Sequence, residues 1–336
     1  MRPMNRRPLF SPSLPLLVLV FAALAACATG PAPAGPASAP AVRFGIVTDS
    51  HYADAEPRGT RPYRESIAKM DECAAAMNAE GVDFLIELGD FKDQDDPPIE
   101  ARTEEYVRRI ERSLRAYSGP RYHALGNHDH DSLSKARFLS LIENAGIPRD
   151  QSAYSFDRAG IRFIVLDANF KADGAPYDHG NFGWDDCSIP PPQIAWLEKV
   201  LASGPPRAII FIHQQLDGAG SYYVRNAAEV RSVLEASGKV LAVFQGHRHE
   251  GAFQRMAGIP YYTLVGMIEG RGPENNSYAI VSVGRDGRIS VQGRRKAQSR
   301  DLGPDDSGMT RGPHNKAGLR VIPPPSVGDE REPGRI

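Results

Sequence analysis

The stretch Val42-Arg43-Phe44-Gly45-Ile46-Val47-Thr48-Asp49-Ser50-His51 shows the pattern that decides the fold. Residues 42–48 are a β-rich apolar run, which predicts a buried strand, and an aspartate and a histidine follow where this run stops. Four more strand-like runs end in the same way. These runs, with the polar residues that follow them, are 82–88 with Asp90, 121–125 with Asn127, His128 and Asp129, 207–212 with His213, and 240–245 with His247 and His249.

The five polar clusters predict a single functional site. In α/β sheets, ligands bind outside the carboxyl ends of the strands. Residues with helical spacing separate the runs, and the chain becomes strand-rich after Gly246, so the sequence predicts an α/β layered domain. The helical positions are Ile67, Met70, Ala74 and Met77, then Ala136, Leu139 and Ile142, and then Ile194, Leu197 and Leu201.

The residue types at these five ends predict a metal site. Hard and borderline divalent cations prefer carboxylate, amide-oxygen and imidazole ligands. Alternate residues of an extended segment project to the same side, so Asp49 with His51, and His247 with His249, can each supply two ligands together. Glycines at positions 89, 126 and 246 would let the chain turn sharply after three of the strands and bring the side chains inward.

The order of the motifs, Asp-x-His, Gly-Asp-x-x-Asp, Gly-Asn-His-Asp, His and Gly-His-x-His, resembles the calcineurin-like metallophosphoesterase superfamily. The resemblance covers about residues 43–295. It implies a four-layer α-β-β-α sandwich that carries a two-metal centre. It also implies hydrolysis of a phosphoester bond, in which the two ions activate a bridging water for attack on phosphorus.

The same resemblance implies a role for each polar residue. His128 would be the general acid or would stabilise the transition state, and Asp129 would orient its imidazole. Asp90 would bridge the two ions. The other implied ligands are Asp49, His51 and His249 for the first metal, and Asn127, His213 and His247 for the second.

Further motifs narrow the resemblance: Tyr52-Ala53-Asp54, Arg61-x-Tyr63-Arg64-x-Ser66, Gln193-x-x-Trp196-Leu197 and Gly266-Met267-Ile268-Glu269. With them the chain resembles the manganese-dependent ADP-ribose/CDP-alcohol diphosphatases. This resemblance implies a phosphodiester or pyrophosphate substrate and favours Mn²⁺ over Fe²⁺ or Zn²⁺, although His51 stands where that family often has glutamine. A phosphomonoesterase and a non-catalytic metal-binding interaction module are the alternatives.

Two loops are candidates for substrate binding. Residues 169–190 form a long stretch with little secondary-structure signal, which is unusual unless it is functional. Its aromatic side chains would either stack on a substrate or fix the loop to the body, and nearby arginines would either clamp phosphate or form surface ion pairs. The candidates are Phe182, Trp184, Tyr222 (in the second loop, 214–224), Arg61, Arg64 and Arg271.

The two ends of the chain differ from its middle. Residues 1–26 are typical of a signal peptide, and Leu24-Ala25-Ala26-Cys27 resembles a bacterial lipobox; an ordinary signal peptide is the alternative. Residues 27–41 predict an Ala/Pro-rich tether and 298–336 a disordered tail, which leaves a folded domain at 42–297. We therefore expect an exported protein held at a membrane surface by a lipid on Cys27.

Composition excludes other classes of protein. The 40 basic and 41 acidic side chains nearly cancel, which argues against a nucleic-acid partner. The partner that the family resemblance implies is a small phosphorylated substrate. Three cysteines are too few for a disulfide scaffold. Cys73 and Cys187 remain a possible pair in an oxidising compartment.

Overall fold

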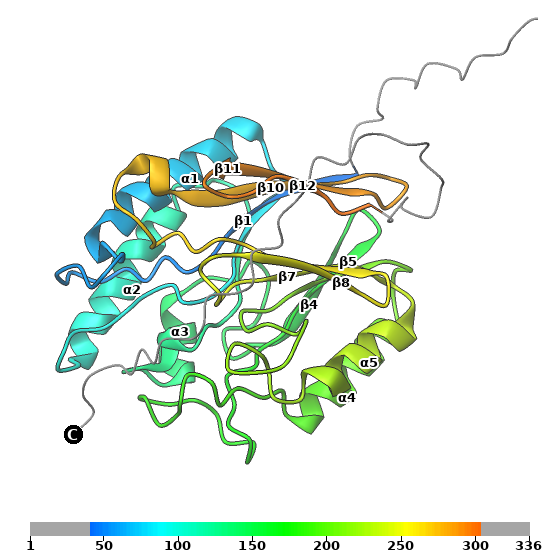
Figure 1. Cartoon of the computed structure of the whole chain (residues 1–336), viewed down its shortest axis with the longest axis horizontal. Helices are drawn as coiled ribbons and strands as arrows, with labels where there is room; N and C mark the ends of the chain where they lie inside the picture. The colour runs from blue at the N-terminus through cyan, green and yellow to red at the C-terminus, as the bar shows by residue number, and fades with distance from the viewer. Residues whose placement is uncertain (1–40, 304–336) are drawn as a thin grey trace, which may run out of the picture. The chain divides into compact units, whose positions relative to one another are not determined.

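The computed structural model describes residues 41–303, which contain two six-stranded sheets (Figure 1). The strand order is β12-β11-β10-β1-β2-β3 in the first sheet and β4-β5-β6-β7-β9-β8 in the second. The first sheet comprises β1 (Val42–Val47), β2 (Phe84–Glu87), β3 (Arg121–His123), β10 (Ser277–Val283), β11 (Ile289–Arg295) and β12 (Arg300–Asp301). The second comprises β4 (Tyr154–Arg158), β5 (Ile161–Val165), β6 (Ala208–Phe211), β7 (Val240–Gln245), β8 (Ala252–Met256) and β9 (Ile259–Thr263).

Each sheet contains a set of neighbouring parallel strands. In the first sheet Gly45 of β1 pairs with Leu85 of β2, and Leu85 pairs with Arg121 of β3. In the second sheet β5, β6, β7 and β9 are parallel neighbours. Parallel strands end at the same edge of a sheet, so the loops that follow β1, β2 and β3 leave side by side, as do those that follow β6 and β7.

Aromatic side chains fill the space between the two sheets. The ring of Phe44 stacks on Phe84 with a centroid separation of 4.9 Å, and it meets Phe163 and Phe211 edge-on at 5.6 Å. All four side chains are fully buried. Since the opposite faces of both sheets are also apolar, each sheet needs a further layer to cover it.

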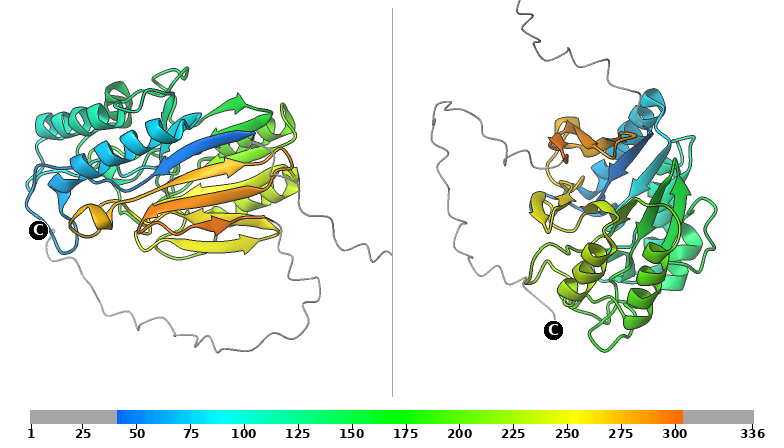
Figure 2. Two further views of the ribbon diagram at one scale, coloured as in Figure 1. Left: turned by 90° about the horizontal axis from the view of Figure 1, so that it is seen from above. Right: turned by 90° about the vertical axis from the view of Figure 1, so that its right-hand side faces the viewer.

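Helices supply these two outer layers and complete the predicted α-β-β-α sandwich (Figure 2). Met70, Met77 and Ile110 pack with Leu85 and Ile280 of the first sheet, while α4 and α5 pack on the second. The helices over the first sheet are α1 (Ser66–Glu80), α2 (Glu100–Leu114) and α3 (Lys135–Leu141). Those over the second are α4 (Pro191–Ala202) and α5 (Ala227–Ser237), and the short 3-10 turns are η1 (Tyr63–Glu65), η2 (His128–His130) and η3 (Pro273–Asn275).

Several elements are not among those predicted from the sequence, namely α2, α5, β4 and β8. In α2 charged residues dominate and the apolar stripe is narrow, with Val107, Ile110 and Leu114 buried on one side. Packing on the first sheet stabilises such a helix, since an amphipathic face contributes more than local propensity.

The ends of the chain require one correction. Residues 298–303 belong to the fold rather than to a disordered tail, because β12 pairs with β11 through Asp301 opposite Ser290 and Arg300 opposite Val291. The predicted signal peptide, Cys27, the tether up to residue 40 and the tail from 304 lie outside the described residues. Within residues 41–303, no helix is both long and apolar enough to cross a membrane.

The two described cysteines do not form a disulfide. Both are free and fully buried. Cys73 packs among the helices over the first sheet and Cys187 among the residues over the second, so both sheets separate them.

Candidate metal centre

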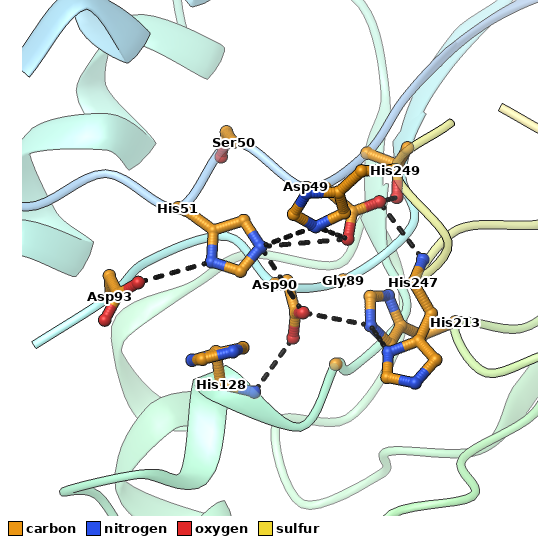
Figure 3. Close-up of polar contacts among 12 residues, drawn as sticks. Asp49, Ser50, His51, Gly89, Asp90, Asp93, His128, His213, His247 and His249 are labelled. Atoms are coloured by element: carbon orange, nitrogen blue, oxygen red, sulfur yellow. Dashed lines mark hydrogen bonds and ion pairs between the residues drawn. The ribbon is translucent and has the colours of Figure 1, made fainter. Parts of the chain in front are cut away.

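The five polar clusters meet at one edge of the sandwich. Asp49 and His51 follow β1, Asp90 follows β2, and Asn127 with His128 follows β3. The second sheet contributes His213 after β6 and His247 with His249 after β7. Figure 3 shows the side chains of Asp49, His51, Asp90, His213, His247 and His249 pointing toward one another. The His128 N–H donates to Asp90 Oδ1, so the cluster after β3 joins them.

Glycines allow the loops to approach this closely. Gly89 has a φ of 100°, which L-residues rarely adopt, and a Cβ there would lie 2.6 Å from the backbone nitrogen of Gly126. A Cβ at Gly126 would collide with the Asp90 carboxylate, and one at Gly246 with the Thr48 hydroxyl. The predicted turn is therefore present at Gly89, whereas the other two glycines are needed for close contact.

Four residues of the site hold left-handed backbone conformations. The φ angles are 52° at Asp49, 42° at His51, 57° at Asp90 and 68° at His247. Such conformations are costly for residues other than glycine and persist where the surroundings enforce them. Hydrogen bonds do so here: the His51 N–H donates to the Asp90 carbonyl at 2.9 Å, and the His247 N–H donates to Asp49 Oδ2 at 3.1 Å.

Four donor atoms form the first ligand group, which consists of Asp49, His51, Asp90 and His249. His51 Nε2 and His249 Nε2 lie 3.2 Å apart, and His249 Nε2 lies 3.2 Å from Asp49 Oδ1. His51 Nε2 is 3.5 Å from Asp90 Oδ2. Two imidazole nitrogens and two carboxylate oxygens thus surround one small space.

The second ligand group consists of Asp90, His213 and His247. His213 Nε2 lies 3.2 Å from Asp90 Oδ2 and 3.2 Å from His247 Nδ1. Asn127 is buried as well, and its Oδ1 has no hydrogen-bond partner, as expected of an amide oxygen kept for a cation. Asp90 belongs to both groups and lies between them (Figure 3).

Acceptors hydrogen-bond the Nδ1 atoms of two imidazoles, and a carboxylate faces the Nδ1 atom of a third. His249 Nδ1 lies 2.6 Å from Glu269 Oε1, His213 Nδ1 lies 2.8 Å from the Leu88 carbonyl oxygen, and His51 Nδ1 faces Asp93 Oδ2 at 3.5 Å. A proton on each Nδ1 satisfies these acceptors and leaves the Nε2 lone pair for a metal, the arrangement that is usual around metal-bound histidines.

His128 belongs to neither of the two groups that contain Asp90, and its ring packs edge-on against His51 at a centroid distance of 4.7 Å. With His51 and Asp93 it forms a further set of close donor atoms. Its backbone N–H donates to Asp90 Oδ1 at 2.8 Å, and its Nδ1 lies 2.7 Å from Asp131 Oδ2. Its side chain keeps 28% exposure, so Nε2 is the nitrogen left for a substrate.

The role predicted for Asp129 needs correction, because Asp131 holds the His128 imidazole. The Asp129 carboxylate is fully buried and accepts three backbone N–H groups, from Gly126 at 2.8 Å, Phe91 at 3.0 Å and Asp90 at 3.2 Å. It therefore fixes the loops after β2 and β3 relative to each other.

The charges of the site favour ionised carboxylates. Burial alone would raise the pKa of Asp49 and of Asp90, but the neighbouring histidines hold both pKa values well below the usual range. Burial would likewise lower the pKa of His128, whereas the carboxylates of Asp131 and Asp90 raise it to about 10. The residues thus offer anionic oxygens to a cation and keep a protonated imidazole next to them.

The donor set fits divalent cations. Carboxylate oxygens, an amide oxygen and imidazole nitrogens are the ligands that Mn²⁺, Fe²⁺ and Zn²⁺ accept. Asp49 Oδ1, Asn127 Oδ1 and His247 Nε2 are buried without a hydrogen-bond partner. With a proton on each Nδ1, the Nε2 atoms of His51 and His249 face each other at 3.2 Å as two lone pairs with no proton donor between them. A cation in each group would satisfy the converging lone pairs.

The candidate aromatic residues have different positions. Phe182 is buried and stacks on Tyr177 at 3.8 Å, so it fixes its loop internally. Trp184 and Tyr222 are exposed, and each ring centroid lies 5.8 Å from that of His247. Of the three candidate aromatic side chains, Trp184 and Tyr222 therefore lie beside the ligand groups and Phe182 does not.

The candidate arginines pair with acidic side chains. Arg61 Nε lies 3.3 Å from Glu269, the residue that holds His249. Arg64 binds Asp54 and Glu56 on the surface, and Arg271 lies 3.6 Å from Glu65. Arg64 and Arg271 therefore form surface ion pairs, which was the alternative to binding phosphate. Arg61, by contrast, lies next to the first ligand group.

Sequence reasoning missed a sixth strand end that supports the site. After β5, the buried Asn169 donates from Nδ2 to the Leu125 carbonyl at 2.8 Å and accepts at Oδ1 from Gln214 Nε2 at 2.7 Å. It thereby links the Gly-Asn-His-Asp loop to the residue after His213. The apolar run 161–166 followed by Asp167 and Asn169 carried the same signal as the other five ends.

Comparisons with known proteins agree with this geometry. Residues 42–251 match the family described as calcineurin-like phosphoesterase. A "Manganese-dependent ADP-ribose/CDP-alcohol diphosphatase" of Oryza sativa subsp. japonica is 27% identical over 277 residues, which are 68% of this chain and 84% of that protein. A protein of the same name from Arabidopsis thaliana is 26% identical over 311 residues, 78% of this chain and 97% of that protein.

Solved structures share the fold. A dimetal phosphatase from Danio rerio superposes with a TM-score of 0.67 at 22% identity, covering 79% of this chain and 100% of that one. A purple acid phosphatase from yellow lupin gives a TM-score of 0.52 at 15% identity, covering 77% of this chain and 52% of that one. Since the family match spans more than half of the chain, this protein belongs to the calcineurin-like phosphoesterase family, hydrolases that act on phosphoester bonds.

Proposed function

We propose that this chain is a binuclear, manganese-dependent hydrolase that cleaves the pyrophosphate bond of a nucleoside-diphosphate-linked alcohol or a similar phosphodiester. The observation that carries the proposal is the position of Asp90 between two ligand groups, with His128 beside them. The relatives named as manganese-dependent diphosphatases support the substrate class and the metal.

The first cation would be held by Asp49, His51 and His249 and the second by Asn127, His213 and His247, with Asp90 shared between them. When bound, two divalent ions would lower the pKa of water and neutralise charge on phosphoryl oxygens. The chain's own contribution is the orientation of these donors, which the left-handed loops and the anchored imidazoles fix before a substrate arrives.

His128 would act on the leaving group. Asp131 binds its Nδ1, so the proton on Nε2 is directed away from the carboxylate and is free for the departing oxygen. A positioned acid of this kind contributes about 10²–10⁴ in rate. Asp129 would act indirectly, through the backbone amides of Asp90 and Gly126 that it holds.

Initial rates on ADP-ribose, CDP-choline and p-nitrophenyl phosphate, with Mn²⁺ and with a chelator control, test the proposal. We expect the two diphosphates to be cleaved preferentially and all activity to disappear with the chelator. Preference for p-nitrophenyl phosphate would make the chain a phosphomonoesterase, and Mn²⁺ binding without any turnover would make it a non-catalytic module.

We further propose that the protein is exported and lipid-anchored at Cys27. Arg2, Arg6 and Arg7 precede the apolar run 14–26, which ends at this cysteine. Expression in a bacterium with labelled palmitate should label the membrane fraction of the wild type but not of Cys27→Ser. Equal labelling of both would contradict the anchor.

A further inference from the structure

Two exposed aromatic rings stand beside the second ligand group. Within residues 41–303, the large hydrophobic side chains with the greatest exposure are Ile99, Trp184 and Tyr222, at 46%, 45% and 40%. The rings of Trp184 and Tyr222 lie 5.5 Å apart, and each lies 5.8 Å from the ring of His247. Trp184 is in the loop between β5 and α4 and Tyr222 in the loop between β6 and α5, so two separate segments converge here.

The loops do not need these rings for their own packing. Tyr177 and Phe182 already fix the first loop, since their rings stack at 3.8 Å with an interplanar angle of 2° and both are buried. Val224 fixes the second loop, because it is only 2% exposed and packs with the residues that cover the second sheet. Large apolar groups that remain exposed next to a site are typical of ligand contact.

We propose that Trp184 and Tyr222 form a stacking surface for the nucleobase of the substrate. This inference rests on the proposed function and specifies its substrate class as a nucleotide. The base of a 5′-nucleotide is joined to its phosphate by a single ribose, so a phosphate at the ligand groups leaves the base within reach of rings that adjoin His247.

The separation of the two rings limits how a base can bind to them. A base between two rings needs about 3.5 Å of van der Waals separation on each side, so it cannot insert between rings whose centroids are 5.5 Å apart. Because the two ring planes are inclined by 56°, a base would stack on one ring and contact the other at an angle. Recognition by stacking tolerates different bases, because every base has a π-face.

A positive charge accompanies the aromatic surface. The guanidinium carbon of Arg248 lies 5.9 Å from the centroid of Tyr222, and the side chain is 41% exposed. Its Nε lies 3.7 Å from Oε2 of the exposed Glu250, which offsets part of this charge. Arg248 follows the candidate ligand His247 directly. A cation at this position favours an anionic ligand such as a nucleotide over a neutral aromatic compound.

Tryptophan fluorescence tests the surface without any turnover. The chain has two tryptophans, so Trp196→Phe leaves Trp184 as the single reporter. With Mn²⁺ present, AMP and CMP should quench this emission, whereas ribose 5-phosphate at equal concentration should not. Equal effects of all three compounds, or none, would overturn the inference, and wild type compared with Trp184→Phe gives the same readout if Trp196→Phe fails to fold.

Kinetics give the second test. Trp184→Ala and Tyr222→Ala should each raise KM for ADP-ribose about 5- to 100-fold, the range expected for one lost stacking contact, and leave the inhibition constant of inorganic phosphate unchanged. Ile99→Ala is the matched control, since Ile99 is equally exposed but precedes α2. An unchanged KM in both aromatic variants would refute the inference.

The two proposals can fail separately. If AMP quenches Trp184 but no nucleoside diphosphate is cleaved, the aromatic surface stands and the proposed reaction is wrong. If ADP-ribose is cleaved well and the aromatic variants have the wild-type KM, the reaction stands and the stacking surface is wrong.

Discussion

The two ligand groups share Asp90 but are built differently. In the first group, Asp93 and Glu269 face the outer nitrogens of His51 and His249. In the second, a backbone carbonyl holds His213 and the further candidate is a neutral amide. Carboxylate partners raise the basicity of imidazole ligands, so the first group should bind a cation more tightly than the second.

This difference suggests different roles for the two cations. Glu269 and Arg61 flank the first group, whereas the second lies beside exposed Trp184 and Tyr222. A tightly held cation would organise the centre, and a weaker one beside the aromatic rings would meet the substrate. The following variants test the contrast, from the largest expected effect to the smallest.

Asp90→Asn should affect both groups at once. Loss of the shared carboxylate removes a ligand from each, so we expect activity to fall by more than about 10³-fold, the scale of transition-state stabilisation by metal ions. Metal content measured by mass spectrometry should fall at both positions. Asp178→Asn, an exposed loop acid, is the control, and retention of two ions by Asp90→Asn would contradict the shared position.

Asn127→Ala should affect the second group alone. The variant lacks the buried amide oxygen, so Mn²⁺ content should fall from two ions per chain toward one, and turnover should be largely abolished. Asn181→Ala in an exposed loop should have neither effect. Near-native activity of Asn127→Ala would remove this residue from the ligand set.

His128→Ala separates acid catalysis from metal binding. Because its ring lies beside the groups rather than within them, we expect about two ions per chain and turnover slower by about 10²–10⁴. His179→Ala, with 48% side-chain exposure, should behave as the wild type. Loss of an ion from His128→Ala would instead make this histidine a ligand.

Glu269→Gln should weaken the first group only. Loss of a carboxylate that orients a metal-bound histidine usually costs about 10–100-fold in metal affinity. Titration with Mn²⁺ should show this loss for the tighter ion and an unchanged affinity for the weaker one. Glu274→Gln, an exposed acid five residues away, is the control; a change confined to the weaker ion would reverse our assignment.

Asp131→Asn should change the pH dependence of turnover. Asp131 raises the pKa of His128, so its removal lowers that pKa and the acid form is lost earlier as the pH rises. The alkaline limb of the kcat profile should move about 1–3 pH units lower, and His128→Ala should abolish the response. An unmoved limb would show that His128 is not the acid.

The metal centre was predictable because strand ends determine it. Each of the five clusters follows an apolar run directly, and parallel pairing brings these ends together whatever the loops between them. The alternation of strand and helix patterns predicted an α/β layered domain, and the family resemblance implied its four layers. Pattern reading failed, however, for several elements. Among them are α2, whose charged surface hides its apolar stripe, and β12, which lacks apolar residues of its own.

Proximity in the sequence did not predict which carboxylates hold the imidazoles of the site. Asp129 is next to His128, but in the 3-10 turn η2 the residues three apart align, so Asp131 reaches the imidazole. Glu269 is 20 residues from His249, and the buried Lys69 positions it by donating to the carbonyls of Met267 and Gly270. Such contacts depend on tertiary structure.

Equilibrium binding of Mn²⁺ to the chelator-stripped chain tests the central claim most directly. Two unequal ligand groups that share Asp90 predict two ions per chain that bind in separate steps, with turnover appearing as the second step fills. A single ion per chain, or full turnover after the first ion, would contradict a two-cation centre.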